Sequence, residues 1–139
     1  MAPTLEETFQ PPRWMRGPHL QSMLPSLPVR RTWIERRAMT LLGASEEVLL
    51  DCGDDVRLQA FASGQAQRGG DPGRVAVILH GWEGSAESLY VLSLGQELFD
   101  RGYEVVRLNL RDHGATHHLN REIFHSCRLT EVEIGRAHV

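Results

Sequence analysis

The sequence predicts an α/β fold in which an antiparallel hairpin precedes a strand, helix, strand unit of a mostly parallel sheet. Two extended-type runs, residues 47–52 and 56–62, flank a Gly-Asp-Asp turn, which is typical of a hairpin. An apolar run at residues 75–79 and a strand-like run at residues 105–110 flank a helix-like pattern. We expect the connection between these two strands to be a right-handed crossover.

Composition limits the class of protein. A chain of 139 residues with 41% hydrophobic residues has room for one domain with a core. A net charge of -3, with 24% charged residues of both signs, argues against a nucleic-acid partner. Arg30, Arg31, Arg36 and Arg37 form a local basic run, for which we expect a solvated surface.

Targeting and redox signals are weak. No apolar stretch reaches the roughly 18 residues that a membrane span needs, so we expect no transmembrane segment. Glu6 and Glu7 stand where a signal peptide would be basic, which favours a cytoplasmic protein. Cys52 and Cys127 suggest reduced thiols rather than a disulfide framework.

Residues 1–46 form a Pro-rich N-terminal extension. Six of the seven prolines lie between Met1 and Pro28, and proline interrupts long helices and strands. The sequence here predicts short turns or one brief helix near residues 19–24.

Residues 47–132 form the predicted α/β region. The hairpin turn is Gly53-Asp54-Asp55, and residues 63–73, rich in Gly and Gln, are expected to be an exposed loop. Residues 75–79 are apolar without alternation, which is typical of a parallel strand covered on both faces.

The predicted helix begins at Ser85 as N-cap and ends at Gly102, a residue suited to left-handed backbone. An apolar stripe at helical spacing faces the sheet, with a glycine that permits close packing: Val91, Leu94, Gly95 and Leu98. After the second strand, residues 111–132 are polar and histidine-rich, and we expect a loop.

Residues 133–139 have a separate origin in our interpretation. Ile134-Gly135-Arg136-Ala137-His138-Val139 is the translation, in one frame, of the sequencing-library adapter AGATCGGAAGAGCACACGTC. We therefore expect this tail to be non-native. Resequencing the genomic DNA by an independent method tests this, because an identical ending would contradict it.

The chemistry-bearing motif is His80-Gly81-Trp82-Glu83-Gly84-Ser85, a turn that follows a buried strand and opens a helix. Backbone amides in such a turn favour an anion. A dinucleotide-binding loop needs G-x-G-x-x-G, and a Walker loop needs Gly-Lys-Ser/Thr, so neither pattern fits. An HG dipeptide after an apolar strand is instead typical of an oxyanion loop, whose donor here is the amide of Trp82.

Four landmarks in order resemble the YheT-like branch of the α/β-hydrolase superfamily, which is related to esterases and lipases. They are Phe9-Gln10-Pro11-Pro12 with His19-Leu20-Gln21-Ser22 ("F.P" and "HLQT"), the His80 to Ser85 motif ("HGLEGSS") with Tyr90 in the next helix, Asn109-Leu110-Arg111-Asp112-His113-Gly114 ("NFRGCGG") and Phe124-His125-Ser126 ("YHSG"). Trp82 replaces the usual leucine, and Asp112-His113 replaces Gly-Cys.

The resemblance implies that this chain is the N-terminal part of an ester-cleaving α/β-hydrolase fold. It implies an oxyanion-hole donor at Trp82, with His80, Gly81 and Gly84 supporting the loop. The serine nucleophile, on a G-x-S-x-G elbow, and the acid and histidine of the triad would come later in the chain. No such elbow is present, so this fragment has no catalytic residue and is predicted to be inactive.

The full-length parent would act on a small-molecule or lipid-like carboxylic ester, without a cofactor. The strand at residues 75–79 would neighbour an absent strand, so its open apolar edge predicts aggregation or self-association.

Three alternatives stay open. The parent could be a non-catalytic binding protein with the same fold, or a hydrolase with an aspartate nucleophile. His113, His117, His118 and His125 could suggest a zinc site, but their spacing fits no metal motif, so we expect none.

Overall fold

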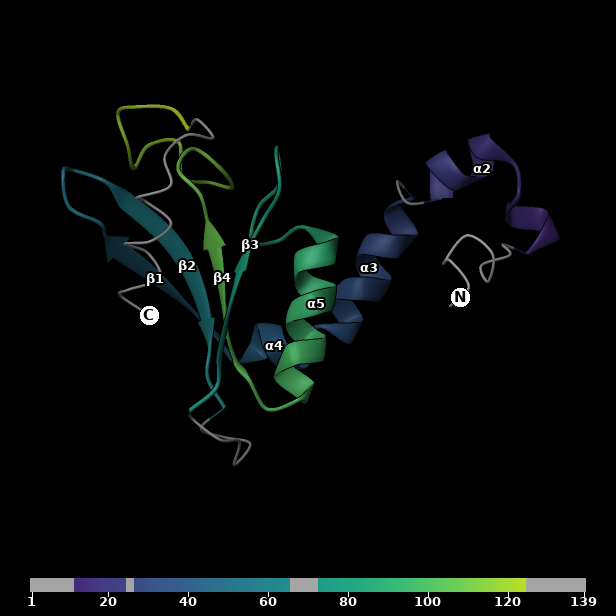
Figure 1. The fold of residues 1–139 in the computed structure, drawn as a ribbon, viewed down its shortest axis with the longest axis horizontal. Helices are drawn as coiled ribbons and strands as arrows, with labels where there is room; N and C mark the ends of the chain where they lie inside the picture. The colour runs from purple at the N-terminus through teal and green to yellow at the C-terminus, as the bar shows by residue number, and fades with distance from the viewer. Residues whose placement is uncertain (1–11, 25–26, 66–72, 125–139) are drawn as a thin grey trace, which may run out of the picture. The chain divides into compact units, whose positions relative to one another are not determined.

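The computed structural model describes residues 12–24, 27–65 and 73–124 of the chain (Figure 1). The chain divides into two compact units, Met1–Trp33 and Ile34–Val139. In the first unit, a 3-10 helix η1 (Arg13–Met15) precedes α2 (Pro18–Met23), which confirms the predicted brief helix. The side-chain amide of Gln21 donates to the Met15 carbonyl at 2.7 Å and links the two turns.

Two helices were not predicted: α3 (Pro28–Arg37), whose last residues from Ile34 belong to the second unit, and α4 (Met39–Gly43). Proline was expected to interrupt helices, yet Pro18 and Pro28 are the first residues of α2 and α3. The first turn of a helix tolerates proline, because the missing N–H would have no partner there. The four arginines of the basic run are exposed, as predicted.

The second unit contains a four-stranded mixed sheet, which confirms an α/β architecture. Its strands are β1 (Ser45–Asp51), β2 (Arg57–Ser63), β3 (Val75–Leu79) and β4 (Glu104–Asn109), in the order β1-β2-β4-β3. β2 pairs antiparallel with both β1 and β4, whereas β3 pairs parallel with β4. The predicted hairpin and the predicted parallel pair are both confirmed.

The hairpin turn has three consecutive residues with left-handed backbone. The φ angles are 77° for Gly53, 49° for Asp54 and 60° for Asp55. Glycine and aspartate tolerate this region better than other residues, so the Gly-Asp-Asp sequence suits the turn.

Helix α5 (Leu89–Asp100) begins three residues later than predicted. The Ser85 amide donates to Ser88 Oγ at 2.9 Å, and the Glu87 amide donates to Ser85 Oγ at 3.2 Å. Because these serine hydroxyls bond to nearby backbone amides, they hold a local turn that competes with the helix. Ser88, not Ser85, occupies the N-cap position. Gly102 ends the helix with a φ of 84°, as expected.

The buried stripe of α5 is only partly as predicted. Val91 and Gly95 are buried, but Leu94 is 50% exposed, and Leu92 and Phe99 are buried instead. The stripe is wider because α5 packs against two sets of residues. Val91 and Phe99 join a cluster with Leu41, Ile78 and Val105, whereas Leu92 joins Ile34 and Ala38. A Cβ on Gly95 would lie 3.0 Å from Leu41 Cδ2, so the glycine permits the close approach.

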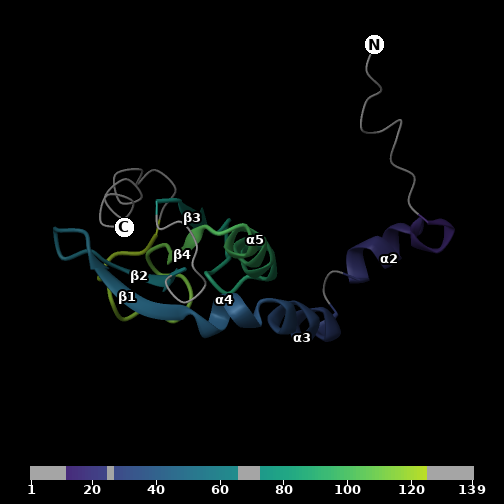
Figure 2. The ribbon, with the colours of Figure 1, turned by 90° about the horizontal axis from the view of Figure 1, so that it is seen from below.

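The sheet has two different faces. Helices α4 and α5 lie on the same side of the sheet, against Ile78 and Val105 (Figure 2). On the other face, a second cluster consists of Leu50, Cys52, Leu58, Ala60, Val106 and Leu108. The buried Cys52 is a thiol, and Cys127 lies outside the described residues. β4 lies between β2 and β3, and its side chains point alternately to the two faces.

Two predictions about burial need correction. Strand β3 is covered on both faces only at its centre, where Ile78 and Val77 pack against opposite clusters, while Val75 and Leu79 at its ends are exposed. Gln65 was expected in an exposed loop but is buried. Its side-chain amide donates to the carbonyls of Phe99 at 2.6 Å and Tyr103 at 2.9 Å, beside the end of α5.

The remaining regions carry fewer elements. Residues 110–124 are turns and bends, as predicted, whereas residues 125–132 and the tail at 133–139 lie outside the described residues. In the described ranges no helix is both long and apolar enough to cross a bilayer.

Candidate active site

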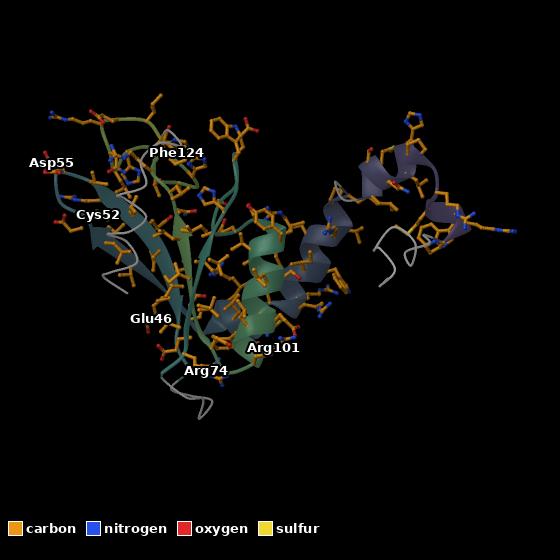
Figure 3. All side chains as sticks on the ribbon, in the orientation of Figure 1. Glu46, Cys52, Asp55, Arg74, Arg101 and Phe124 are labelled. Atoms are coloured by element: carbon orange, nitrogen blue, oxygen red, sulfur yellow. The ribbon has the colours of Figure 1, made fainter. Side chains whose placement is uncertain are left out.

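The candidate site comprises two loops at the carboxyl ends of neighbouring parallel strands. Residues 80–88 follow β3, and residues 110–124 follow β4. Figure 3 shows Phe124 at this end of the sheet, with Arg74 and Arg101 at the opposite end. The carboxyl ends of parallel strands are where α/β folds generally bind ligands.

The first loop begins with a tight turn. The Gly84 amide donates to the Gly81 carbonyl at 2.9 Å, and Glu83 has a φ of 55°. A Cβ on Gly84 would lie 2.8 Å from Tyr90 Oη and 2.9 Å from the Gly81 carbonyl oxygen. The turn therefore has no room for a side chain at residue 84.

Nearly every backbone amide of this loop has an acceptor. The bonded amides are those of Gly81, Gly84, Ser85, Ala86, Glu87 and Ser88, with the acceptors Tyr90 Oη, Gly81 O, Ser88 Oγ, Asn109 Oδ1, Ser85 Oγ and Ser85 O respectively. Within the described part of the chain, the amides of Trp82 and Glu83 have no acceptor. Successive N–H groups in a turn can bind an anion, so this pair is the free donor set of the loop.

Tyr90 is a residue whose role the sequence did not reveal. Its hydroxyl oxygen accepts the Gly81 amide proton at 2.5 Å, from the first turn of α5. This bond occupies the amide beside Trp82 and fixes the turn to the helix. Sequence reasoning recognised Tyr90 only as part of the helix, because a tyrosine in a first turn has no diagnostic spacing.

His80 joins the two loops. Its Nε2 accepts the Leu110 amide proton at 3.1 Å, so Nδ1 carries the hydrogen that is donated to the Gly81 carbonyl at 2.8 Å. Burial lowers the pKa of His80; the bond to the Gly81 carbonyl raises it, and the charge of His113 lowers it further. With both ring nitrogens occupied and the pKa lowered, His80 supports the loop and is not placed to act as a base.

A row of aromatic rings crosses the site. The ring centroids of His80 and His113 are 4.6 Å apart, those of His113 and Phe124 5.0 Å, and those of Phe124 and Trp82 6.2 Å. Trp82 is 75% exposed at the outer end of the row. The ring of Trp82 thus places apolar surface next to its own unbonded amide.

The second loop contains two residues with left-handed backbone. Asp112 has a φ of 64°, a conformation that glycine adopts most easily and that aspartate tolerates. The Asp112 carboxylate accepts a hydrogen bond from His117 Nδ1 at 2.5 Å. Gly114 has a φ of 66°.

His113 and His117 each have a partner within the second loop. No group of three His, Cys, Asp or Glu side chains in the described ranges could hold a metal ion. His113 Nδ1 lies 2.9 Å from the Arg111 carbonyl, and His117 bonds Asp112, while His125 is outside the described residues.

The other landmarks belong to other parts of the chain. His19 to Ser22 lie in α2 of the first unit, whereas Phe9 to Pro11, His125 and Ser126 lie outside the described residues. Ser85 and Ser88 bond the loop backbone and each other's peptide, so neither is presented as a nucleophile.

No protein-family model, no curated protein and no solved structure matches the chain. The case for a function therefore depends on the motifs and on the geometry of the two loops.

Proposed function

We propose that this chain is the N-terminal part of an α/β-hydrolase of the YheT-like type, whose complete polypeptide hydrolyses carboxylic esters with a serine nucleophile. In this proposal residues 80–84 are the oxyanion loop, and the Trp82 amide is one of two donors to the oxyanion. The observation that carries the proposal is the unbonded pair of amides at Trp82 and Glu83, in a loop whose other amides are bonded.

The mechanism assigns this chain a limited part. Serine attacks the ester carbonyl while the triad histidine takes its proton, and the negative oxygen of the tetrahedral intermediate accepts hydrogen bonds from Trp82 N–H and from an amide beside the nucleophile. The intermediate collapses to the acyl-enzyme as the C–O bond breaks, and the histidine returns the proton to the departing alcohol. Water then hydrolyses the acyl-enzyme to release the carboxylic acid and free serine, and the reaction needs no cofactor. The exposed ring of Trp82 provides apolar surface for a small-molecule or lipid-like acyl group.

A matched pair of variants at Trp82 tests the donor in the complete polypeptide. Trp82→Pro deletes the N–H, and proline fits the second position of a β-turn. We expect kcat to fall about 100- to 1,000-fold, the usual cost of an oxyanion donor. Trp82→Ala keeps the N–H and removes the ring, so we expect the larger change in KM. Equal kcat values for the two variants would contradict the proposal.

The isolated chain provides a second test. Because it lacks a G-x-S-x-G elbow, it should hydrolyse no p-nitrophenyl ester above background and should take up no fluorophosphonate label. The complete polypeptide should be labelled on serine. Labelling of this chain would contradict the assignment. A complete polypeptide that takes up no label but forms an aspartyl-ester intermediate would have an aspartate nucleophile. A complete polypeptide with neither the label nor this intermediate would be a binding protein.

The proposal also includes self-association through β3. In the described residues its outer edge has no strand partner, and Val75 and Leu79 are exposed on it. Open apolar edges pair with other strands. Analytical ultracentrifugation should show dimers or larger species, whereas a monodisperse monomer with a cooperative melt would contradict this. The proposed cytoplasmic location can be checked by cell fractionation.

A further inference from the structure

The residue that joins the oxyanion-type loop to α5 is held from both sides by one strand. Ala86 is fully buried, its N–H donates to Asn109 Oδ1 at 2.7 Å, and its carbonyl accepts from Arg107 Nη1 at 2.9 Å. Arg107 and Asn109 are alternate residues of β4, so their side chains leave the strand on the same face. Both backbone polar groups of Ala86 are therefore fixed to the sheet.

A buried arginine is energetically unfavourable at this position. Arg107 is 1% exposed, its Nε has no partner in the described structure, and its remaining bond is to Ser45 Oγ at 3.0 Å. Burial lowers the pKa of Arg107, and the charge of Glu87 opposes the change. Removing a guanidinium from water costs several kcal/mol, and a well-packed apolar residue in the same place would not carry this cost. The contacts that distinguish arginine from such a residue are the hydrogen bonds to Ala86 and Ser45 and the placement of the guanidinium 5.2 Å from the Phe61 ring centroid. Of these, only the bond to Ala86 reaches the loop.

Asn109 is equally constrained. Its amide nitrogen donates to Gln59 Oε1 at 2.6 Å, which orients the oxygen toward Ala86. A Cβ on Gly114 would lie 2.6 Å from Asn109 Nδ2, so the second loop leaves space for this side chain only because residue 114 is glycine.

From these contacts we infer that Arg107 and Asn109 are positioning residues, which hold Ala86 so that the Trp82 and Glu83 amides keep their orientation. Two further hydrogen bonds fix the loop on the N-terminal side of Ala86. Ser85 N–H donates to Ser88 Oγ, and Gly84 N–H donates to the Gly81 carbonyl. The amides of Trp82 and Glu83 lie between bonded residues at both ends of the turn. This inference rests on the proposed function only for what those two amides bind.

The test is residue-resolved amide hydrogen exchange by NMR on the intact chain. Asn109→Ala and Arg107→Met should speed exchange at Ala86, Gly81 and Gly84 by about tenfold, the scale of one lost buried hydrogen bond. Exchange of β2 amides such as Leu58 should change no more than global stability does. The control is Asn120→Ala. Asn120 belongs to the second loop, but its side chain bonds the N–H and the carbonyl of Arg57, at 2.9 and 2.8 Å, rather than Ala86.

A conservative variant separates positioning from general stability. Asn109→Asp keeps an oxygen acceptor for the Ala86 amide and loses the donor to Gln59, so it should restore slow exchange at Ala86. If Arg107→Met does not fold, the comparison of Asn109→Ala with Asn109→Asp still tests the inference. A uniform rise in exchange across the sheet and the loop, an unchanged Ala86, or failure of the aspartate variant to restore protection would each overturn the inference.

The two proposals fail separately. If the Trp82→Pro and Trp82→Ala variants have equal kcat while the exchange pattern holds, the ester chemistry is wrong and the positioning stands. If the kcat difference holds and exchange at Ala86 is unaffected by Asn109→Ala, the positioning is wrong.

Discussion

The two faces of the sheet are formed by the same strands but by different chemistry. One face carries the wholly apolar cluster of Leu50, Cys52, Leu58, Ala60, Val106 and Leu108. On the α5 face, β4 places Arg107 and Asn109 beside Val105, and the buried Ser63 bonds the Leu41 carbonyl and Ser45 Oγ. Apolar burial is non-directional, whereas hydrogen bonds fix orientation. The α5 face also has an apolar cluster, formed by Leu41, Ile78, Val91, Phe99 and Val105, so both faces contribute stability. Only the α5 face adds the buried hydrogen bonds that position a loop.

The largest effect that separates the faces is expected from Leu108→Ala on the apolar side. Leu108 is 1% exposed, so the variant should lower the free energy of unfolding by about 2–5 kcal/mol. Urea denaturation followed by circular dichroism measures it. The control Leu49→Ala, at a residue 54% exposed, should change stability by no more than about 0.5 kcal/mol. Similar losses for both leucines would remove the distinction between core and surface on this side.

On the loop side, the next effect is expected from Gly84→Ala. The new Cβ would meet the Gly81 carbonyl and Tyr90 Oη below 3.0 Å, and relieving this overpacking should cost about 1–3 kcal/mol. Gly64→Ala is the matched control, because nothing lies within 4 Å of its Cβ. Thermal melts compare the two, and a Gly84→Ala variant as stable as its control would show that the turn can relax.

Tyr90→Phe gives a smaller effect with a defined location. The variant leaves the Gly81 amide without its acceptor, at a cost of about 0.5–1.5 kcal/mol, and should speed exchange of that amide. Tyr103→Phe is the control, since the Tyr103 ring stacks under Arg74 and the substitution keeps the ring. Faster exchange at Gly81 in the control would contradict the assignment of this bond to Tyr90.

The smallest effect concerns pH. Because folding lowers the pKa of His80 below its ordinary value of 6.5, the unfolded chain takes up the proton first as the pH falls. The stability that neutral His80 supports is complete above about pH 6.5 and is lost as the pH falls below it toward the lowered pKa of the folded state. Denaturation midpoints from about pH 7.5 to about pH 5 should decrease less in His80→Gln than in the unsubstituted chain.

Periodicity and turn chemistry predicted the strands well. The Gly53 to Asp55 turn, the strand at 75–79 and the left-handed Gly102 were all found where local residue preferences placed them. These features depend on a few neighbouring residues. The start of α5 was missed because two serines, each suited to an N-cap, lie three residues apart. Ser88 Oγ accepts from the Ser85 amide, whereas Ser85 Oγ accepts from the Glu87 amide.

Features that depend on distant contacts were not predictable from the sequence. Gln65 is buried because the carbonyls of Phe99 and Tyr103 lie beside it, and Leu92 because Ile34 and Ala38 pack there. Within the candidate site, the motif identified residues 80–84 as a loop. Tyr90 Oη and Asn109 Oδ1 accept the neighbouring amides of Gly81 and Ala86, and the amides of Trp82 and Glu83 are left unbonded. No spacing in the sequence indicates that Tyr90 and Asn109 are these acceptors.

The strand order has a consequence for how the protein is made. Among the described strands, β4 comes last in the sequence, yet it lies between β2 and β3. As the polypeptide leaves the ribosome, β3 therefore has no strand partner until β4 emerges about 30 residues later. Nascent chains with exposed apolar strands are common clients of chaperones. Translational pausing between these strands should lower the yield of folded protein more than pausing inside the hairpin.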